Sequence, residues 1–321
     1  MCFLFFNLPL DEGDLSMMFN ADKMAFGRHE TFGLRYGWLS KGFQAVVDKK
    51  DVFDSDDATV RLGVGKNMVA AIKYWLRACR MIDPVDNIPT ELGNKLLSVD
   101  GFDPYLEDEA TIWLLHWVLA TNAELATSWY WFFNRFHKPE FAGQELATAL
   151  TDFVNDQVTN KKKTSSSTLK NDALLITRMY TQSKGSSRAP IEDALDSPFA
   201  LLKLITLNAG GRSYQSRPSS RPDLPLGVLG FAVCEMFEMK GTSAIPIEDF
   251  MYSKDNYPAI GSTFRLTESD LVLKLERLVE YIPGVFDIRD TAGQHQLYLS
   301  GDIEAIEFIV KHYKSREDIA A

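Results

Sequence analysis

One stretch of the sequence, residues 65–82, constrains the fold more than any other. Apolar side chains recur in it at the three- and four-residue spacing of an α-helix. They are Met68, Ile72, Trp75, Leu76 and Cys79. The opposite side of this helix carries Lys66, Lys73, Arg77 and Arg80. No acidic residue occurs from residue 58 to residue 82. The pattern predicts an amphipathic helix that packs on a core and presents a basic face to solvent.

The flanking residues place this helix in a winged helix-turn-helix. Residues 34–49 and 56–62 have the patterns of two earlier helices, with Gly63 as the turn. Residues 84–97 then provide a proline-containing connection, where a wing could lie, and a further helix. In such modules the second helix of the motif enters the major groove of DNA. We therefore predict DNA contact by Arg28, Arg35, Arg61, Lys66, Asn67, Lys73 and Arg77. The alternative is a solvated basic face with no ligand.

Length, charge and cysteine content narrow the possible classes. A chain of 321 residues suits two domains better than one. A net charge of −10 argues against a protein that coats nucleic acid over its whole surface. Three scattered cysteines are too few for a disulfide framework or a Cys-based zinc site, which favours the cytoplasm. We expect neither a signal peptide nor a membrane span.

The overall pattern predicts a mainly α fold with small β wings, in two helical domains that each contain a winged helix-turn-helix. The expected domains are residues 20–158 and 169–315, with a polar linker at 159–168. Gly, Ser and Pro dominate the basic stretch 208–225, which we expect to be a mobile loop without regular structure.

The second winged helix is expected near the end of the chain. Residues 226–240 and 267–282 have helical patterns. Val285–Arg289 and Gln294–Leu299 alternate apolar and polar residues around a turn, which predicts a β-hairpin. The helix at 267–282 mixes basic and acidic residues, which favours a protein-binding role over DNA contact.

Two groups of side chains are candidates for catalysis. His29 lies beside Glu30 between aromatic residues, and such a pair can perform acid–base chemistry. The alternative is that this peptide only begins a helix and anchors the core. Asp103, Glu107 and Asp108 precede a helix together with Glu109 and could hold magnesium. The alternative is stabilisation of the helix N-terminus by negative charge.

Other features argue against specific chemistries. His116 lies in an apolar run and has no companion at metal-ligand spacing, so we expect a hydrogen-bonded core histidine. Pro222-Asp223 with Glu238 and Lys240 spells a restriction-type nuclease signature. That site requires a strand where Glu238 and Lys240 have a helical pattern, so we attribute the signature to chance.

Several longer segments carry a resemblance to a known family. They include FGRHETFGLRYGWLSKGF, ATVRLGVGKNMVAAIKYWL, YLEDEATIWLLHWVLA and RPDLPLGVLGFAVCE. These segments resemble the SspB-like family of bacterial DNA phosphorothioation systems, over essentially residues 25–300. The resemblance implies a part in replacing a non-bridging phosphate oxygen of DNA by sulfur, in phage defence, and in nicking the DNA strand. It implies partnership with a cysteine desulfurase, an ATPase and an ATP pyrophosphatase.

The leading hypothesis is a DNA endonuclease that nicks one strand and depends on Mg²⁺ or Mn²⁺. The resemblance implies functional roles at these motif positions: Arg28, His29, Glu30, Arg35, the basic helix and the stretch from Asp103 to Asp108. The runner-up is a non-catalytic winged-helix adaptor or regulator that binds DNA and recruits the modification enzymes. A third hypothesis is a structural assembly protein that self-associates, for example as a homodimer.

Overall fold

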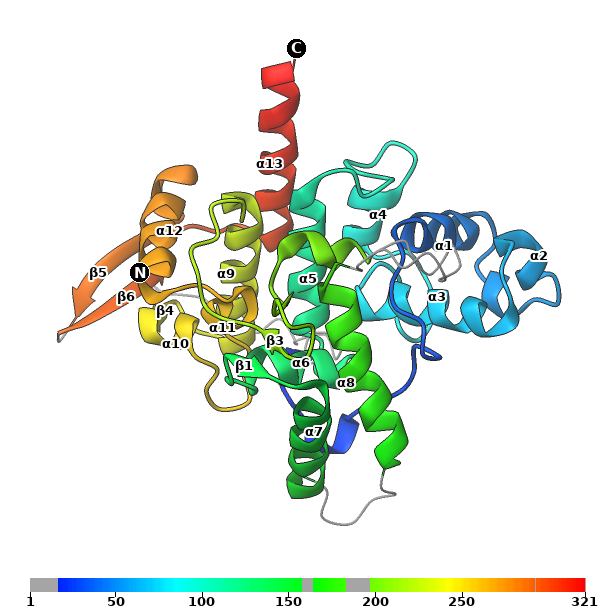
Figure 1. Cartoon of the computed structure of the whole chain (residues 1–321). Coiled ribbons are helices and arrows are strands. Elements are labelled where there is room, and N and C mark those ends of the chain that lie inside the picture. The colour runs from blue at the N-terminus through cyan, green and yellow to red at the C-terminus, as the bar shows by residue number, and fades with distance from the viewer. Residues whose placement is uncertain (1–16, 158–163, 183–196, 292, 321) are drawn as a thin grey trace.

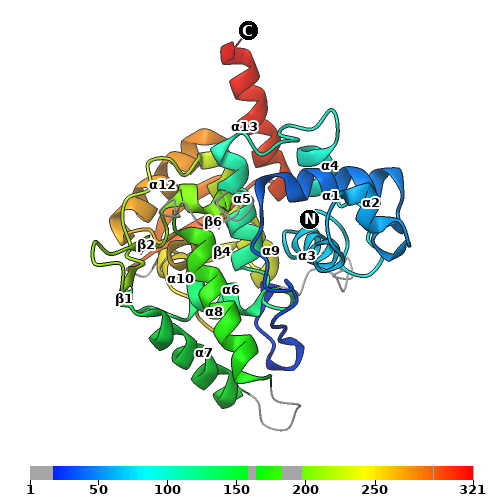
Figure 2. The same ribbon diagram turned by 45° about the vertical axis from the view of Figure 1, so that its right-hand side comes forward.

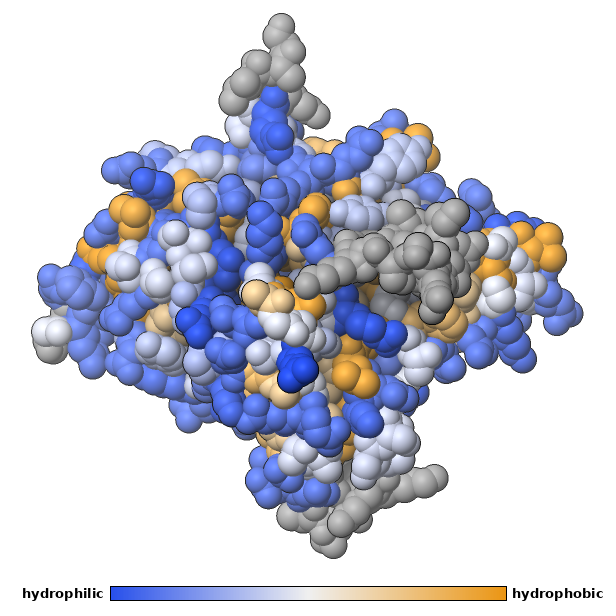
Figure 3. All heavy atoms as spheres, viewed as in Figure 1, coloured by the Kyte–Doolittle hydropathy of each residue, from blue (hydrophilic) through white to orange (hydrophobic). Residues whose placement is uncertain are grey.

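Helices form most of the computed structural model, with two small antiparallel sheets (Figure 1), as expected for a mainly α fold. The structure describes residues 17–157, 164–182, 197–291 and 293–320. No helix among these residues is long and apolar enough to cross a membrane. The face seen in Figure 3 is largely hydrophilic, and its hydrophobic residues are scattered over it.

Four helices form one end of the molecule, at the right of Figure 1. They are α1 (Tyr36–Asp48), α2 (Ala58–Leu62), α3 (Lys66–Ala78) and α4 (Glu91–Leu97). Gly63 ends α2 in the left-handed conformation, with φ of 60°, and so makes the turn to α3. Gly42 lets α1 approach α3 closely, because a Cβ there would lie 2.5 Å from Ile72. The helices thus follow the expected order. At the site expected for a wing, a single bridge joins Ile82 to Pro89.

The centre of the molecule is a helical layer rich in aromatic residues. Its helices are α5 (Glu109–Ala120), α6 (Thr127–Asn134), α7 (Gly143–Gln157) and α8 (Ser166–Tyr180). Every residue of α5 after Glu109 is buried, which accounts for its uninterrupted apolar sequence. Helices α7 and α8 lie side by side in Figures 1 and 2 and pack together.

The expected linker lies between α7 and α8. Residues 159–163 are outside the described residues, and α8 begins at Ser166, where Ser165 caps the helix by accepting a hydrogen bond from Thr168 N. One cluster of buried hydrophobic residues continues across this point, from the N-terminal to the C-terminal helices. The division into domains 20–158 and 169–315 stays a prediction.

The basic stretch 208–225 corrects the expectation of a loop without regular structure. Here β3 (Tyr214–Gln215) is the middle strand between β1 (Glu140–Phe141) and β2 (Thr206–Leu207). Ser216 follows, is buried, and donates its N–H to the carbonyl of Pro139 at 3.0 Å. Pairing with a distant strand gives these backbone groups the partners that the local sequence did not indicate.

The C-terminal part begins with helices around a strand. In order they are α9 (Leu226–Lys240), β4 (Ala244–Pro246), α10 (Ile247–Met251), α11 (Ile260–Phe264) and α12 (Glu268–Tyr281). The strands β5 (Phe286–Thr291) and β6 (Gln294–Leu299) form the expected hairpin, and β4 pairs with β6. This hairpin projects at the left of Figure 1, at the opposite end from α2 and α3. The last helix, α13 (Ala305–Ala320), packs on α9.

Candidate nucleic-acid interface

A pocket of about 440 Å³ lies beside the exposed face of α3. Four basic side chains and one acidic side chain are part of its lining: Lys23, Arg28, Lys73, Arg77 and Glu124. Tyr74 joins them, and its hydroxyl donates to the carbonyl of Leu125 at 3.1 Å. The structure therefore brings the basic helix together with the peptide before α1. In the sequence, these two segments were related only because both contain basic residues. We call this group of residues the basic pocket.

Several predicted DNA contacts already have partners within the protein. Nζ of Lys73 lies 2.9 Å from Oδ1 of Asp54, and Nε of Arg61 lies 2.6 Å from Oδ2 of Asp57. Both acids lie just before the acid-free stretch from 58 to 82. Arg77 donates to Oδ1 of Asn87, with the shorter bond at 2.7 Å. These pairs fix the basic side chains and reduce their net field.

Other predicted contacts remain available to a ligand. Arg28, Lys66 and Asn67 are exposed. None of their side chains forms a hydrogen bond or ion pair with another described residue. Arg35 instead lies over the ring of Trp38, with 5.1 Å from its guanidinium carbon to the ring centre.

Arg80 does not lie on the basic face. It follows the end of α3 with φ of 57°, and its guanidinium pairs with the carboxylate of Glu235 in α9 at 2.7 and 3.0 Å. The indole N–H of Trp117 donates to the same carboxylate at 2.6 Å. The assignment of Arg80 to the basic stripe is therefore wrong. The helix ends at Ala78, so the periodicity no longer holds beyond that residue.

His29 is a buried structural residue, with 1% of its surface exposed. Its Nδ1 accepts the N–H of Thr31 at 3.1 Å, so the ring proton is on Nε2, which donates to Oδ1 of Asp172 at 2.9 Å. Both ring nitrogens are thus engaged within the protein. This geometry supports the alternative in which His29 anchors the core, and it leaves no nitrogen to accept a proton from water.

Glu30 lies in solvent, away from the basic pocket. It is exposed in a tight turn with φ of 51°, next to Thr31 with φ of 66°. Its side chain is not part of the lining of the basic pocket, nor of the pockets beside α5 and between α10 and α12. The histidine and the glutamate are therefore neighbours in sequence without sharing a cleft.

Asp103 and Asp108 organise the start of α5. The buried carboxylate of Asp103 accepts the N–H groups of Glu107 at 2.8 Å and Asp108 at 3.0 Å, and the hydroxyl of Thr111 at 2.5 Å. Asp108 caps the helix through Ala110 N and forms an ion pair with Arg316. Glu107 is exposed. This arrangement supports the alternative in which these acids stabilise the helix N-terminus.

A second pocket, of about 350 Å³, lies beside the first turn of α5. Glu109 and Asp223 contribute carboxylates to its lining, and Lys203 and Arg221 contribute cations. Burial raises the pKa of Glu109, and the negative charge of Asp223 raises it further, while Lys203 and the Trp113 indole oppose this effect. We call this group of residues the α5 pocket.

The sequence places Glu109 and Asp223 in separate motifs and does not indicate that the two residues line one pocket. Glu109 appeared only as a companion of Asp103, Glu107 and Asp108, and Asp223 only within a signature attributed to chance. Glu238 and Lys240 do lie in helix α9, and Lys240 pairs with Asp249 at 3.1 Å. The residues that accompany Asp223 come from α5 and from the end of the short helix η4 (Pro198–Leu202) instead.

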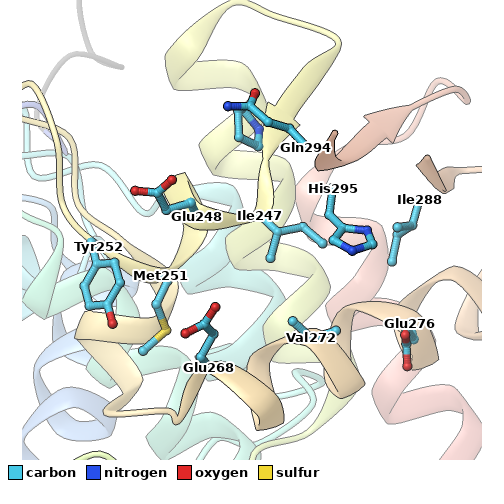
Figure 4. Close-up of a pocket in the computed structure, with 11 residues that line it drawn as sticks. Ile247, Glu248, Met251, Tyr252, Glu268, Val272, Glu276, Ile288, Gln294 and His295 are labelled. Atoms are coloured by element: carbon cyan, nitrogen blue, oxygen red, sulfur yellow. The ribbon is translucent and has the colours of Figure 1, made fainter. Parts of the chain in front are cut away.

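A third pocket lies in the C-terminal part, between α10, α12 and the β5–β6 hairpin (Figure 4). Its volume is about 350 Å³. Ile247, Met251, Val272 and Ile288 provide apolar surface, and Glu248, Glu268 and Glu276 provide carboxylates. Phosphate groups are repelled by such a lining. We call this pocket the acidic groove.

His116 is a core histidine, as expected. Its Nε2 lies 2.9 Å from the carbonyl of Thr263 and its Nδ1 lies 2.8 Å from the hydroxyl of Tyr180. Because a carbonyl only accepts, Nε2 carries the proton and Nδ1 accepts from the tyrosine. Burial lowers the pKa of His116 from 6.5 to about 3.

Comparison with known proteins agrees with the fold over nearly the whole chain. Residues 26–313 match the family described as protein of unknown function, DUF4007. A crystal structure of magnesium ion-bound SspB superposes with a TM-score of 0.78 and is 30% identical, over 92% of this chain and 90% of the SspB chain. This chain belongs to the SspB-like DUF4007 family. The resemblance found in the sequence is thereby confirmed.

A second crystal structure of SspB matches this SspB-like chain equally well. It has a TM-score of 0.78 and 30% identity, over 94% of this chain and 90% of the SspB chain. A search of curated proteins gave no match.

The magnesium ion in one SspB structure raises the question of which residues could hold one here. Within the described residues, no group of three or more His, Cys, Asp or Glu side chains could hold a metal ion. Magnesium, however, usually keeps several waters and binds through one or two carboxylates together with phosphate oxygens. The donor set of the α5 pocket, with Glu109 and Asp223, fits this requirement. The fully engaged carboxylate of Asp103 does not.

Proposed function

We propose that this chain is the DNA-binding, DNA-nicking component of a bacterial DNA phosphorothioation system. The observation that carries the proposal is the basic pocket, in which α3 and the peptide before α1 present Arg28, Lys73 and Arg77 together. Membership of the SspB-like family supports the system in which the chain acts. A cysteine desulfurase, an ATPase and an ATP pyrophosphatase are its proposed protein partners.

Duplex DNA contacts the N-terminal helices in this proposal. Helices α2 and α3 with the turn at Gly63 act as a helix-turn-helix, and Lys66 and Asn67 at the exposed start of α3 reach the major groove. Arg28, Lys73 and Arg77 neutralise phosphates, with Arg35 and Arg61 at the edge of the footprint. Asp54 and Asp57 are displaced from their basic partners when phosphate takes their place.

The C-terminal part is the second winged helix in this proposal. The order of α9, β4, α10, α12, β5 and β6, with β4 paired to β6, supports that assignment. Its carboxylate-lined groove disfavours DNA at this end of the molecule.

Strand cleavage requires stabilisation of the charge that develops on phosphate. Magnesium or manganese, when bound, supplies positive charge for that purpose. In this proposal the protein positions the sugar-phosphate backbone of DNA through the basic pocket and holds carboxylates near the phosphate that is cleaved. Among the catalytic candidates named from the sequence, only Glu30 and Glu107 have exposed carboxylates.

The test of DNA binding uses fluorescence anisotropy with a short duplex. Lys66→Glu combined with Lys73→Glu should weaken binding by about 100-fold or more, because each site turns attraction into repulsion. Lys95→Glu combined with Lys314→Glu makes the same charge change on α4 and α13 and should have a much smaller effect. Equal losses in the two folded double variants would contradict the interface.

The test of nicking uses supercoiled plasmid with Mg²⁺ or Mn²⁺ and an EDTA control. Open-circular product that requires metal is expected. Glu30→Gln and Glu107→Gln then report on the exposed sequence-derived candidates without disturbing the core. DNA binding without product under any metal would favour the adaptor.

One observation favours that second candidate function. The acidic groove combines apolar surface with three glutamates, which suits a basic amphipathic segment of a partner protein better than DNA. As an adaptor, the chain would bind DNA through α3 and recruit a modification enzyme through this groove. Glu248→Lys with Glu276→Lys should then reduce co-purification of that enzyme and leave DNA affinity unchanged.

A further inference from the structure

The inner face of the β5–β6 hairpin extends beyond the hydrophobic core that supports it. Phe286, Ile288 and Asp290 lie on this face of β5, because successive side chains alternate across a strand. Phe286 is buried, and Leu297, which pairs with Ile288, is buried as well. Ile288 is half-buried, and beyond it Asp290 and its partner His295 are exposed. The hairpin projects from the body of the molecule in Figure 1, so the described part of the chain leaves the outer half of this face open.

Helices α10 and α12 stand opposite this face and complete the acidic groove (Figure 4). The apolar part of the lining comes from both helices and from β5: Ile247, Met251, Val272 and Ile288. Tyr252 follows α10, lines the same groove and is 49% exposed. An exposed apolar surface with a polar rim is typical of a site where another protein binds. The groove therefore offers a place where apolar side chains of a partner can leave water.

The rim of the groove carries negative charge that the described residues do not neutralise. Glu268, Val272 and Glu276 follow at intervals of four residues and so share one side of α12, with the two glutamates on either side of Val272 in Figure 4. Both glutamates are exposed, and neither carboxylate forms an ion pair or hydrogen bond with another described residue. Glu248, by contrast, pairs with Lys254 at 3.0 Å. None of the described residues that line the groove is a lysine or arginine.

We infer that the acidic groove binds an amphipathic α-helix of a partner protein, with apolar side chains on one face and lysine or arginine side chains on its flanks. The apolar face packs on Val272 and Ile288, and the flanking cations pair with Glu268 and Glu276. These glutamates lie eight residues apart, about 12 Å along α12, so a partner helix of about three turns reaches both. The chemistry of this helix follows from the groove, whereas its origin in a modification enzyme rests on the proposed function.

A helix suits the groove better than an extended segment or DNA. Ile288 and His295 reach the groove from the face of the sheet, so side chains, rather than the backbone of a strand edge, meet a ligand there. The carboxylates of the rim repel phosphate groups. The groove also lies at the opposite end of the molecule from α3 (Figure 1), so the chain can hold a partner helix and duplex DNA at the same time.

A synthetic peptide of about 15 residues serves as the probe, because shorter helices are marginal in water. One labelled peptide carries leucines on one helical face and lysines on its flanks. A second peptide has the same composition, with the leucines distributed around the helix. Fluorescence anisotropy with the full chain at physiological salt, which screens general attraction to an acidic protein, should show that the first peptide binds at least about 10-fold more tightly.

The carboxylates of the rim are tested by neutral variants of similar shape. Glu268→Gln combined with Glu276→Gln should weaken binding of the amphipathic peptide by about 10-fold, because two ion pairs are lost. Asp152→Asn combined with Asp156→Asn removes two exposed acids of α7 and should not change it. Circular dichroism checks that both variants are folded.

Duplex anisotropy, measured separately on the same variants, distinguishes the groove from the proposed function. Both neutral variants should keep DNA affinity, whereas Lys66→Glu with Lys73→Glu should lose it and keep the peptide. If the wild-type protein binds the peptide through the groove but does not bind DNA, the proposed function fails and the groove stands. Equal affinities for the two peptides, no binding of the amphipathic peptide, or unchanged affinity in the glutamine variant overturns the groove. A wild-type dimer that the glutamine variant dissociates also overturns it, because a second copy then occupies the groove.

Discussion

The carboxylate of Asp172 in α8 lies 2.9 Å from Nε2 of His29, although 143 residues separate them in sequence. The same carboxylate accepts the N–H of Gly27 at 3.1 Å and the hydroxyl of Ser128 at 2.7 Å. Asp172 therefore fixes the peptide on either side of Arg28, which faces the basic pocket from this peptide. A buried group far from solvent thus positions an exposed residue of the candidate interface.

Replacing Asp172 by asparagine should destabilise the protein by about 2 kcal/mol, because the amide nitrogen that takes the place of one carboxylate oxygen cannot accept from the donors that point at that oxygen. DNA affinity should fall as well, since Arg28 loses its fixed position. Urea unfolding and duplex anisotropy measure the two effects. Asp152→Asn, an exposed change in α7, is the control for stability. An Asp172→Asn variant as stable as wild type would contradict the anchoring role.

The salt dependence of DNA binding should report single phosphate contacts. Arg28→Ala should reduce the slope of log K against log [salt] by about 1, because one fewer counterion is released. Arg289→Ala should leave the slope unchanged, because this residue lies on the β5–β6 hairpin and pairs with Asp287. A slope that responds to Arg289 and not to Arg28 would place the DNA on the C-terminal hairpin.

His116 should make the folded protein less stable as the pH falls. Its pKa is about 3 in the folded chain and 6.5 when exposed, so only the unfolded chain takes up a proton between these values. Stability contributed by neutral His116 is complete above about pH 6.5. It decreases below that by up to about 1.4 kcal/mol per pH unit.

The comparison for this pH effect is His116→Gln, which keeps a donor for the Thr263 carbonyl and an acceptor for the Tyr180 hydroxyl. Urea unfolding from pH 7 to 4.5 should give a flatter stability profile for the variant than for wild type. Arg265 and Arg221 are the charged neighbours that also disfavour protonation of the ring. Parallel profiles for the two proteins would show that another group controls the acid sensitivity.

The ion pair between Arg80 and Glu235 should couple the N-terminal helices to α9. Glu235→Gln is expected to cost about 2 kcal/mol, less than a fully buried pair because Arg80 is 24% exposed. With Asp172 and Glu235 both bridging the expected boundary, unfolding of the wild type should occur in one transition. Calorimetry measures this. Two well-separated transitions would instead support independently folding domains at 20–158 and 169–315.

Local sequence patterns were sufficient for much of the secondary structure. The face of α3 that packs on α1, the capped start of α5 and the β5–β6 hairpin each depend on spacing or on neighbouring residues. The apolar run around His116 also predicted that this histidine is buried and hydrogen-bonded. Such features can be read from sequence because the physical cause lies within one or two helical turns or one turn of a hairpin.

Only the tertiary structure decided which side chains share a site. Sequence placed His29 beside Glu30, but folding buried the histidine against Asp172 and left the glutamate in solvent. The sequence pattern assigned Arg80 to the basic face of α3, but in the folded chain Arg80 pairs with Glu235 of α9 and lies off that face. The same packing placed Arg28 beside Lys73 and Glu109 near Asp223. The sequence determined the helices and their amphipathic faces because those depend on local periodicity. Tertiary packing decided the pairs His29–Asp172 and Arg80–Glu235 and the composition of the pockets, because Arg28 and Lys73 are 45 residues apart in sequence and the members of the two pairs more than 140.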